Sequence, residues 1–378
     1  MRYPILIILF LLYACSERHS ESWIYAIEPT GTVISSEEAY RHIVDTIFYV
    51  QIDDSVLIPS LGGDYHCITD NYLFFNTKQG LLKYDWNGKF LQKIGEIGEG
   101  PKEYCQYPNI AVDNDNCCLF VYSRPKTILV YSFDGILLNR YHIDMPEDGN
   151  YPKHLYYYDG CLYFFYTNGL GGDRDNYKPL FWVIATTNGT ILSIRRASQE
   201  KVRQTSYKLY NNLSANQTYS DSFIFWDLFN DTIFYVNSEK VNTAYLWKKD
   251  NYRVRESDYD SLGNKRLFSL NLFDTKRFLW IFWTSMDVSD LSKKSMTLYD
   301  RKTKQIYRFD NLYISEKNSN VRLPINLSTY MQYKGREYIL FEMKSKDLYN
   351  IPGALRWGID ENDEEGNPVL VLIRLKDE

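Results

Sequence analysis

Histidine and cysteine, the residues that most often bind transition metals or build nucleophilic sites, are scarce in this chain. Its 378 residues include five histidines and six cysteines. The sequence contains no CxxC pair, no HExxH motif and no Cys/His spacing typical of a zinc site. No histidine lies beside a serine in a nucleophile elbow. We therefore expect no recognisable catalytic constellation and no resident cofactor.

A calcium site is an alternative to the absence of a cofactor, and only the acidic run 360–365 suggests one. This run, Asp-Glu-Asn-Asp-Glu-Glu, is rich in carboxylate oxygens, but it lacks the spaced ligand pattern of a known calcium loop. A solvated acidic loop is the favoured interpretation, because runs of like charge usually face water.

A charge excess of either sign is also missing. The chain has 43 Lys and Arg against 48 Asp and Glu, which gives a formal net charge of −5. A protein that binds nucleic acid usually carries a basic footprint. We therefore predict no nucleic-acid partner.

Long apolar runs are absent except at the N-terminus. Arg2 is followed by the apolar run 5–12, which is too short to span a bilayer as a stable helix but suits a signal peptide. The segment Leu12-Tyr-Ala-Cys15 resembles a bacterial lipobox. We predict a signal peptide over residues 1–14, a lipid on Cys15 that anchors the chain to a membrane, and a polar tether over 15–42. Ordinary secretion with cleavage nearby is the alternative.

Aromatic residues, by contrast, are abundant. The chain has 34 Tyr, 20 Phe and 8 Trp, and 44% of its residues are hydrophobic. These residues occur in short runs separated by turn signals such as Asn-Gly and Asp-Gly, and convincing long amphipathic helices are missing. This pattern is typical of many short β-strands around a sizeable core.

The repeat is clearest after the glycine-rich segment Ile94–Tyr104. Pro101 interrupts any strand pairing there. A phosphate cradle is not favoured for the three glycines, because no helix N-terminus follows them and several glutamates would repel a phosphate. The predicted strands that follow form one four-stranded blade of a β-propeller: Asn109–Val112, Cys118–Tyr122, Ile128–Phe133 and Ile136–Leu138.

The segments 95–104 (GxxGxGPxxY), 107–113 (YPxIAVD) and 128–135 (IxVYxxDG) resemble an NHL-type repeat. They are most similar to the six-bladed β-propeller lipoproteins of Bacteroidetes, a largely uncharacterised family. The resemblance implies an all-β, six-bladed propeller and an address in the cell envelope, at the outer membrane, facing either the periplasm or the medium. It implies no activity.

Six four-stranded blades are expected within a single domain, residues 43–378. Val44–Ile52 has no partner before it in the chain, so we predict that it pairs with Val369–Leu375 and closes the ring without a free sheet edge. Arg255–Phe273 and Lys344–Asn350 are each expected to contain a helical turn or two.

Five cysteines remain after Cys15, and an odd number leaves at least one unpaired within the chain. A disulfide between Cys105 and Cys117 is the sharper alternative, since the envelope is oxidising. Free thiols are the favoured interpretation.

Polar and aromatic residues gather in the loops expected at one mouth of the propeller. We predict that they form a polar pocket where the blades converge, although for His154 a structural role is favoured over catalysis. The candidate ligand-binding residues are Glu103, Tyr104, Arg124, Lys126, His154 and Arg174, with Asp173 beside them.

An envelope-anchored, non-catalytic propeller that binds an unidentified ligand or envelope protein, such as a glycan or a peptide, is the leading functional hypothesis. The alternative is a metal-dependent hydrolase or lyase that acts at the central channel; fold analogy alone supports it. A third hypothesis is a structural subunit, which predicts a broad apolar patch on one face.

Overall fold

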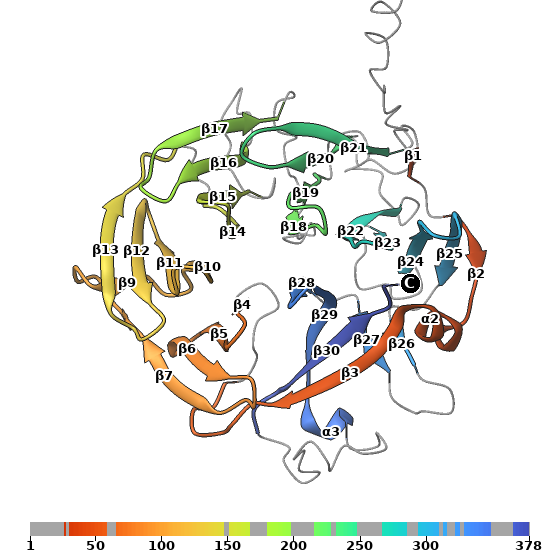
Figure 1. The fold of residues 1–378 in the computed structure, drawn as a ribbon, viewed down its shortest axis with the longest axis horizontal. Coiled ribbons are helices and arrows are strands. Elements are labelled where there is room, and N and C mark those ends of the chain that lie inside the picture. Colours follow the sequence, from red (N-terminus) through yellow and green to blue (C-terminus); the bar gives the residue numbers. More distant parts are fainter. Residues whose placement is uncertain are drawn as a thin grey trace, which may run out of the picture.

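Six antiparallel sheets surround a central axis as the blades of a propeller (Figure 1). The inner strand of each blade lies nearest the axis, and the fourth strand lies at the rim. This confirms the predicted all-β, six-bladed fold. The computed structural model describes residues 26–27, 30–58, 66–146, 151–166, 180–197, 215–227, 232–247, 267–285, 294–309, 313–315, 322–325, 329–348 and 366–377.

The blades follow one another along the chain, and each runs from its inner to its outer strand. Blade one consists of β4 (His66–Ile68), β5 (Tyr72–Thr77), β6 (Gly80–Asp85) and β7 (Phe90–Ile94). Blade two consists of β10 (Asn109–Asp113), β11 (Cys118–Ser123), β12 (Thr127–Ser132) and β13 (Leu137–His142). Blade three consists of β14 (His154–Tyr158), β15 (Cys161–Phe165), β16 (Leu180–Thr186) and β17 (Ile191–Arg196).

The second half of the ring repeats this order. Blade four consists of β18 (Ala215–Gln217), β19 (Phe223–Phe225), β20 (Thr232–Val236) and β21 (Val241–Trp247). Blade five consists of β22 (Leu267–Asp274), β23 (Phe278–Ser285), β24 (Ser295–Asp300) and β25 (Gln305–Phe309). Blade six consists of β28 (Thr329–Tyr333), β29 (Arg336–Met343), β30 (Val369–Leu375) and β3 (Val44–Gln51).

Blade six joins the two ends of the chain. Strand β3 pairs antiparallel with β30, with Val50 opposite Leu370 and Ile47 opposite Ile373. The predicted closure is therefore confirmed. Because β3, from the N-terminal part of the chain, completes blade six, opening the ring would require the hydrogen bonds between β3 and β30 to break.

Buried aromatic side chains fill the space between neighbouring blades. Between blades three and four, the Trp182 and Phe225 rings meet edge to face with centroids 5.2 Å apart, and both residues are fully buried. Burying one such side chain contributes roughly 1.5–3 kcal/mol. The abundance of aromatic residues in the sequence is thus used mainly in the core.

The segment before β3 packs on the rim of the propeller. β1 (Ala26–Ile27) adds parallel to β21, and β2 (Thr32–Val33) adds parallel to β25. Helix α2 (Ser36–Ile43) follows, capped by the Ser35 hydroxyl, which accepts a hydrogen bond from the Glu38 amide at 3.1 Å. The structure differs here from the tether expected over residues 15–42, because the described part of that segment packs on blades four, five and six.

No sequence pattern indicated the inner strands β4, β18, β22 and β28. Of the segment Arg255–Phe273, where a helical turn was expected, residues 267–273 belong to β22 and the remainder lies outside the described residues. The helical turn expected near Lys344–Asn350 is confirmed by α3 (Ser345–Leu348). Two short pairs of strands complete the described elements: β8 (Glu96–Ile97) with β9 (Glu103–Tyr104), and β26 (Tyr313–Ile314) with β27 (Leu323–Pro324).

The alternative disulfide between Cys105 and Cys117 is not formed, and all five described cysteines are free. The Cys105 thiol lies beside the amide of Arg124, after β11, whereas Cys117 lies before β11. A six-residue strand spans about 20 Å, far beyond the roughly 7 Å limit between the Cα atoms of a disulfide.

The two ends of the propeller differ in their connections. Because neighbouring strands in a blade are antiparallel, the turns after the first and the third strand lie at the same end. We call this end the turn face. The opposite end, with the loops between the second and third strands and the connections between blades, is the crossover face.

Candidate functional site

The predicted site residues that the structure describes belong to the crossover face of blades two and three. Glu103 lies in β9, on the connection into blade two, and Arg124 and Lys126 flank the loop between β11 and β12. His154 begins the inner strand of blade three. Arg174 and Asp173, like Cys15, lie outside the described residues.

Tyr104 is a core residue, which corrects its assignment as a ligand-binding side chain. It is fully buried, its hydroxyl donates to the Ile94 carbonyl at 2.9 Å, and the same oxygen accepts from the Leu81 amide at 2.9 Å. Burial raises the pKa of this phenol well above its usual value. Tyr104 therefore ties blade one to the connection that follows it.

His154 is also buried, with 5% of its surface exposed, and its ring stacks on Tyr156 with centroids 6.1 Å apart. The structural role favoured for this histidine fits its position inside blade three.

The glycine-rich segment before blade two is packed around Glu103. The Glu103 carboxylate accepts from the Gly100 amide at 2.8 Å, and a Cβ atom at Gly98 would lie 1.9 Å from a carboxylate oxygen of Glu103. Gly95 has φ +62° and approaches the Tyr131 ring. Two of the glycines therefore serve close packing, and Glu103 is engaged with the segment's own backbone.

Arg124 remains accessible together with an aromatic neighbour. Its guanidinium lies 5.1 Å from the centroid of the Tyr151 ring and donates to the Gln106 carbonyl at 3.3 Å. Both residues are exposed. Lys126 lies nearby in the chain, and its ammonium group is 3.8 Å from the Asp144 carboxylate. These residues form a mixed cationic and aromatic surface on the crossover face.

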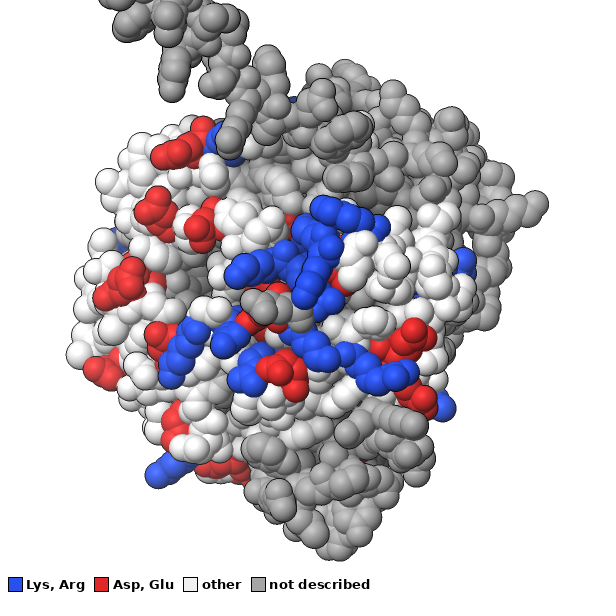
Figure 2. Space-filling view, turned by 45° about the vertical axis from the view of Figure 1, so that its right-hand side comes forward, with Lys and Arg blue, Asp and Glu red and all other residues white. Residues whose placement is uncertain are grey.

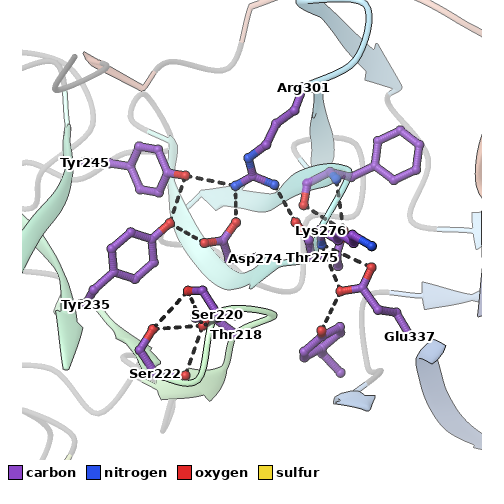
Figure 3. A network of polar contacts seen from close by, with 12 residues as sticks. Thr218, Ser220, Ser222, Tyr235, Tyr245, Asp274, Thr275, Lys276, Arg301 and Glu337 are labelled. Atoms are coloured by element: carbon purple, nitrogen blue, oxygen red, sulfur yellow. Dashed lines mark hydrogen bonds and ion pairs between the residues drawn. The ribbon is translucent and has the colours of Figure 1, made fainter. Parts of the chain in front are cut away.

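A second polar cluster lies between blades four and five at the turn face (Figure 3). The fully buried Asp274 forms an ion pair with Arg301 and accepts a hydrogen bond from the Tyr235 hydroxyl. Arg301 also donates to the Tyr245 hydroxyl at 3.0 Å. Burial raises the pKa of Asp274, and the Arg301 guanidinium opposes this shift. Burial also raises the pKa of Tyr245 to about 12.

Glu337 extends the polar contacts to blade six. Its carboxylate accepts from the Lys276 amide at 2.8 Å and from the Tyr330 hydroxyl at 2.6 Å, and burial raises its pKa. In addition, the Gln332 side chain donates to the Thr218 carbonyl of blade four at 3.1 Å. These contacts join blades four, five and six, so the cluster stabilises the packing of the three blades. No local sequence pattern indicates this cluster, because its members lie far apart in the chain.

Charged side chains are segregated by sign over the turn face. Figure 2 shows Lys and Arg gathered near the middle of the visible surface, with most Asp and Glu to its left and a smaller number beside the basic group and to its right. The exposed lysines in the turns of blades five and six are Lys276, Lys302, Lys304 and Lys334, and the exposed acidic residues in the turns of blades two and three are Asp115, Asp134 and Asp159.

Among the described residues, no group of three or more His, Cys, Asp and Glu side chains is placed to bind a metal ion. In the same part of the chain, no helix combines the length and the apolar character needed to cross a membrane.

The protein is a six-bladed β-propeller, and its surface presents exposed charged and aromatic side chains. The chain belongs to the family described as "Domain of unknown function (DUF4934)", whose model matches residues 33–374. No curated protein matches the sequence.

A solved structure shows the same fold. A protein from Bacteroides fragilis that is described as exported superposes with a TM-score of 0.64 at 16% identity, covering 92% of this chain and 98% of that one. A protein of unknown function from Bacteroides caccae gives a TM-score of 0.40 at 12% identity, covering 65% and 80% of the two chains. At 16% identity, the likeness to the Bacteroides fragilis protein establishes the fold alone.

Proposed function

We propose that this protein is a lipid-anchored binding propeller of the cell envelope that acts without catalysis, and that its ligand docks on the crossover face at blades two and three. The observation that carries this proposal is the exposed pair of Arg124 and Tyr151 beside Lys126. Glu103 and Tyr104 form hydrogen bonds with the backbone of neighbouring segments, and His154 packs inside blade three.

The chemistry of the pair suggests the kind of ligand. A guanidinium near an aromatic ring offers a fixed cation with several donors, and the ring offers a flat apolar surface. A ligand that combines an anionic group with a ring or an apolar side chain can use both. A glycan or a peptide fits this description.

Binding is favoured over catalysis because the buried carboxylates are already engaged. Asp274 pairs with Arg301, Asp300 pairs with Arg277 at 2.9 Å, and Glu337 accepts from Tyr330. A general acid or base needs a carboxylate that can reach its substrate. The alternative of a hydrolase or lyase at the central channel stays a prediction, and no contact among the described residues favours it.

Anchoring through Cys15 is supported by the signal-peptide pattern before it. Metabolic labelling with a radioactive fatty acid should mark the wild-type protein, and Cys15→Ser should lose both the label and membrane association. Cys105→Ser is the matched control and should keep both. A label retained by Cys15→Ser would contradict anchoring at this residue.

The binding site can be tested on glycan and peptide arrays. We expect Arg124→Ala and Tyr151→Ala each to weaken binding to any array hit by about tenfold, which corresponds to about 1.4 kcal/mol. Lys89→Ala, an exposed change in the turn after β6, should leave binding unchanged. Equal affinities for all three variants and the wild type would place the site elsewhere.

A further inference from the structure

Two groups of turns at opposite sides of the turn face carry opposite charge. The acidic sector, formed by the turns of blades two and three, consists of Asp115, Asp134 and Asp159 and contains no Lys or Arg. The basic sector, formed by the two turns of blade five and the turn between β28 and β29 of blade six, consists of Lys276, Lys302, Lys304 and Lys334. Blades one and four lie between the sectors, and their turns carry both signs, as Asp70 with Lys89 and Glu239 with Lys240 show.

Two equivalent turns show how the same backbone presents opposite charges. Asp159 and Gly160 join the first two strands of blade three with φ +47° and +72°, and Lys334 and Gly335 join those of blade six with φ +48° and +70°. No atom lies within 4 Å of the Cβ position of either glycine. Both turns therefore project into solvent, and each carries its charge at the tip.

The four lysines of the basic sector are not neutralised by an ion pair among the described residues, whereas the arginines beside them are. Arg277 pairs with the buried Asp300 at 2.9 Å, and Arg301 pairs with the buried Asp274. In the acidic sector, only Asp134 has a described partner, because the Lys83 ammonium group lies 3.6 Å away. Positive charge in the basic sector and negative charge in the acidic sector are therefore not fully compensated within the described part of the chain.

We propose that the turn faces of two copies of this protein associate about a two-fold axis that lies in the plane of the interface. A two-fold interface uses the same surface on both partners. Rotation about such an axis places the basic sector of each copy over the acidic sector of the other, so both sectors are complemented at the same time. The mixed turns of blades one and four then face their own counterparts.

A second copy fits this surface better than an acidic polymer. A polymer of negative charge would use the basic sector alone and would be repelled by the acidic sector on the same face. Aromatic side chains near the basic sector add contact area: Tyr219 is exposed, and the half-buried rings of Trp86 and Tyr333 lie with centroids 4.5 Å apart. Aromatic residues of this kind are enriched at protein interfaces.

Charge reversal tests the pairing of the sectors directly. The basic-sector variant is Lys302→Glu with Lys334→Asp, and the acidic-sector variant is Asp115→Lys with Asp159→Lys. Asp and Lys already occupy the equivalent left-handed turns of this chain, so the backbone at residues 159 and 334 accepts both. Sedimentation velocity of the full chain in mild detergent, over a range of concentrations, measures association.

We expect the wild type to form a reversible dimer that weakens by about tenfold or more between about 0.05 M and 0.5 M NaCl, because salt screens exposed charges. Each variant alone should be monomeric. An equimolar mixture of the two should restore a 1:1 dimer, since every reversed sector then faces an opposite charge. A cooperative thermal unfolding transition establishes that each variant is folded. If the basic-sector variant does not fold, Lys302→Gln replaces it; if the acidic-sector variant does not fold, Asp115→Asn replaces it.

Three results would overturn the proposal. A wild type that stays monomeric at about 100 μM, far above the range of a specific interface, would exclude this dimer. Variants that still dimerise would place the interface elsewhere, and a mixture that stays monomeric would exclude the pairing of sectors. Polyglutamate that binds a monomeric wild type but not the basic-sector variant would assign the face to an acidic ligand instead. Array binding through Arg124, on the opposite face, is independent of all these results.

Discussion

The carboxylate of Asp274 and the guanidinium of Arg301 form an ion pair inside blade five, where the hydroxyl groups of Tyr235 and Tyr245 from blade four complete the contacts. Asp274 is fully buried, and Arg301 is largely so. A buried pair of this kind contributes little net stability over an apolar pair, but removing one partner leaves an uncompensated charge.

Asp274→Asn should therefore destabilise the protein strongly. We expect a loss of about 3 kcal/mol or more in the free energy of unfolding, measured with urea. Arg336→Ala breaks the more exposed ion pair with Asp377 and is the control, with an expected loss below about 1 kcal/mol. Similar losses for the two variants would show that burial does not set the strength of the Asp274 contacts.

Glu337 should make stability depend on pH in the direction opposite to Asp300. Burial raises the pKa of Glu337 above its usual 4.5, so the folded state holds this proton more tightly than the unfolded state. Relative to Glu337→Gln, the wild type should lose stability as the pH rises from 4.5 through the raised pKa, and the difference should then level off.

For Asp300, burial raises the pKa, but the hydrogen bonds from Arg277 and the Lys302 amide outweigh burial and lower it below 3.8. The advantage of the wild type over Asp300→Asn should accordingly be complete above pH 3.8 and be lost as the pH falls through the lowered pKa. Urea titrations across this range measure both slopes. If the stability difference between the wild type and Glu337→Gln changed with pH in the same direction as that between the wild type and Asp300→Asn, the opposite pKa shifts of Glu337 and Asp300 would be contradicted.

The closing strand β3 should be essential to the ring. Val50 is buried and lies opposite Leu370 in β30. Val50→Pro removes a backbone donor and forces a fixed φ into the strand, and we expect it to cost about 1–3 kcal/mol more than Val50→Ala, which loses only side-chain packing. Equal urea midpoints for the two variants would mean that β3 contributes its side chains but not its ladder.

Gly88 should tolerate a methyl group less well than Gly160. Both residues have a left-handed backbone, with φ +79° and +72°, so an alanine at either strains the turn by about 1–2 kcal/mol. A Cβ atom at Gly88 would also lie 1.9 Å from the backbone oxygen of Gln51 in β3, whereas nothing lies within 4 Å at Gly160. We expect a larger drop in melting temperature for Gly88→Ala; equal drops would exclude close contact with β3.

Most of the middle and outer strands were predictable because each carries its own signal. The run Leu180–Thr186 is almost continuously buried, and turns such as Asn87-Gly88 and Asp134-Gly135 mark the hairpins. The inner strands β18 and β28 were missed because each contains a polar residue, Asn216 or Gln332, that interrupts the apolar pattern and bonds to another blade. Asn216, for example, donates to the Leu272 carbonyl of blade five at 2.7 Å.

The candidate site was predicted less well, for the same reason. Arg124 and Lys126 were recognised as loop residues of one mouth, and they do share the crossover face. The sequence could not show that Tyr104 points into the core, because a tyrosine next to glycine-rich turns suits a binding loop and a packed connection equally. Its two hydrogen bonds, to Ile94 and Leu81, exist only once the connection that carries Tyr104 packs against blade one.

By itself, the sequence determined most of the middle and outer strands and their order, because alternation and turn residues act over a few positions. The pairing of β3 with β30 could be predicted because β3 has no partner before it in the chain. Only the tertiary structure decided which charges meet. Asp274 pairs with Arg301 across 27 positions, and Asp115 shares a face with Lys334 across more than 200. Ring closure brings such residues together, and that geometry leaves no trace in the local pattern around any one of them.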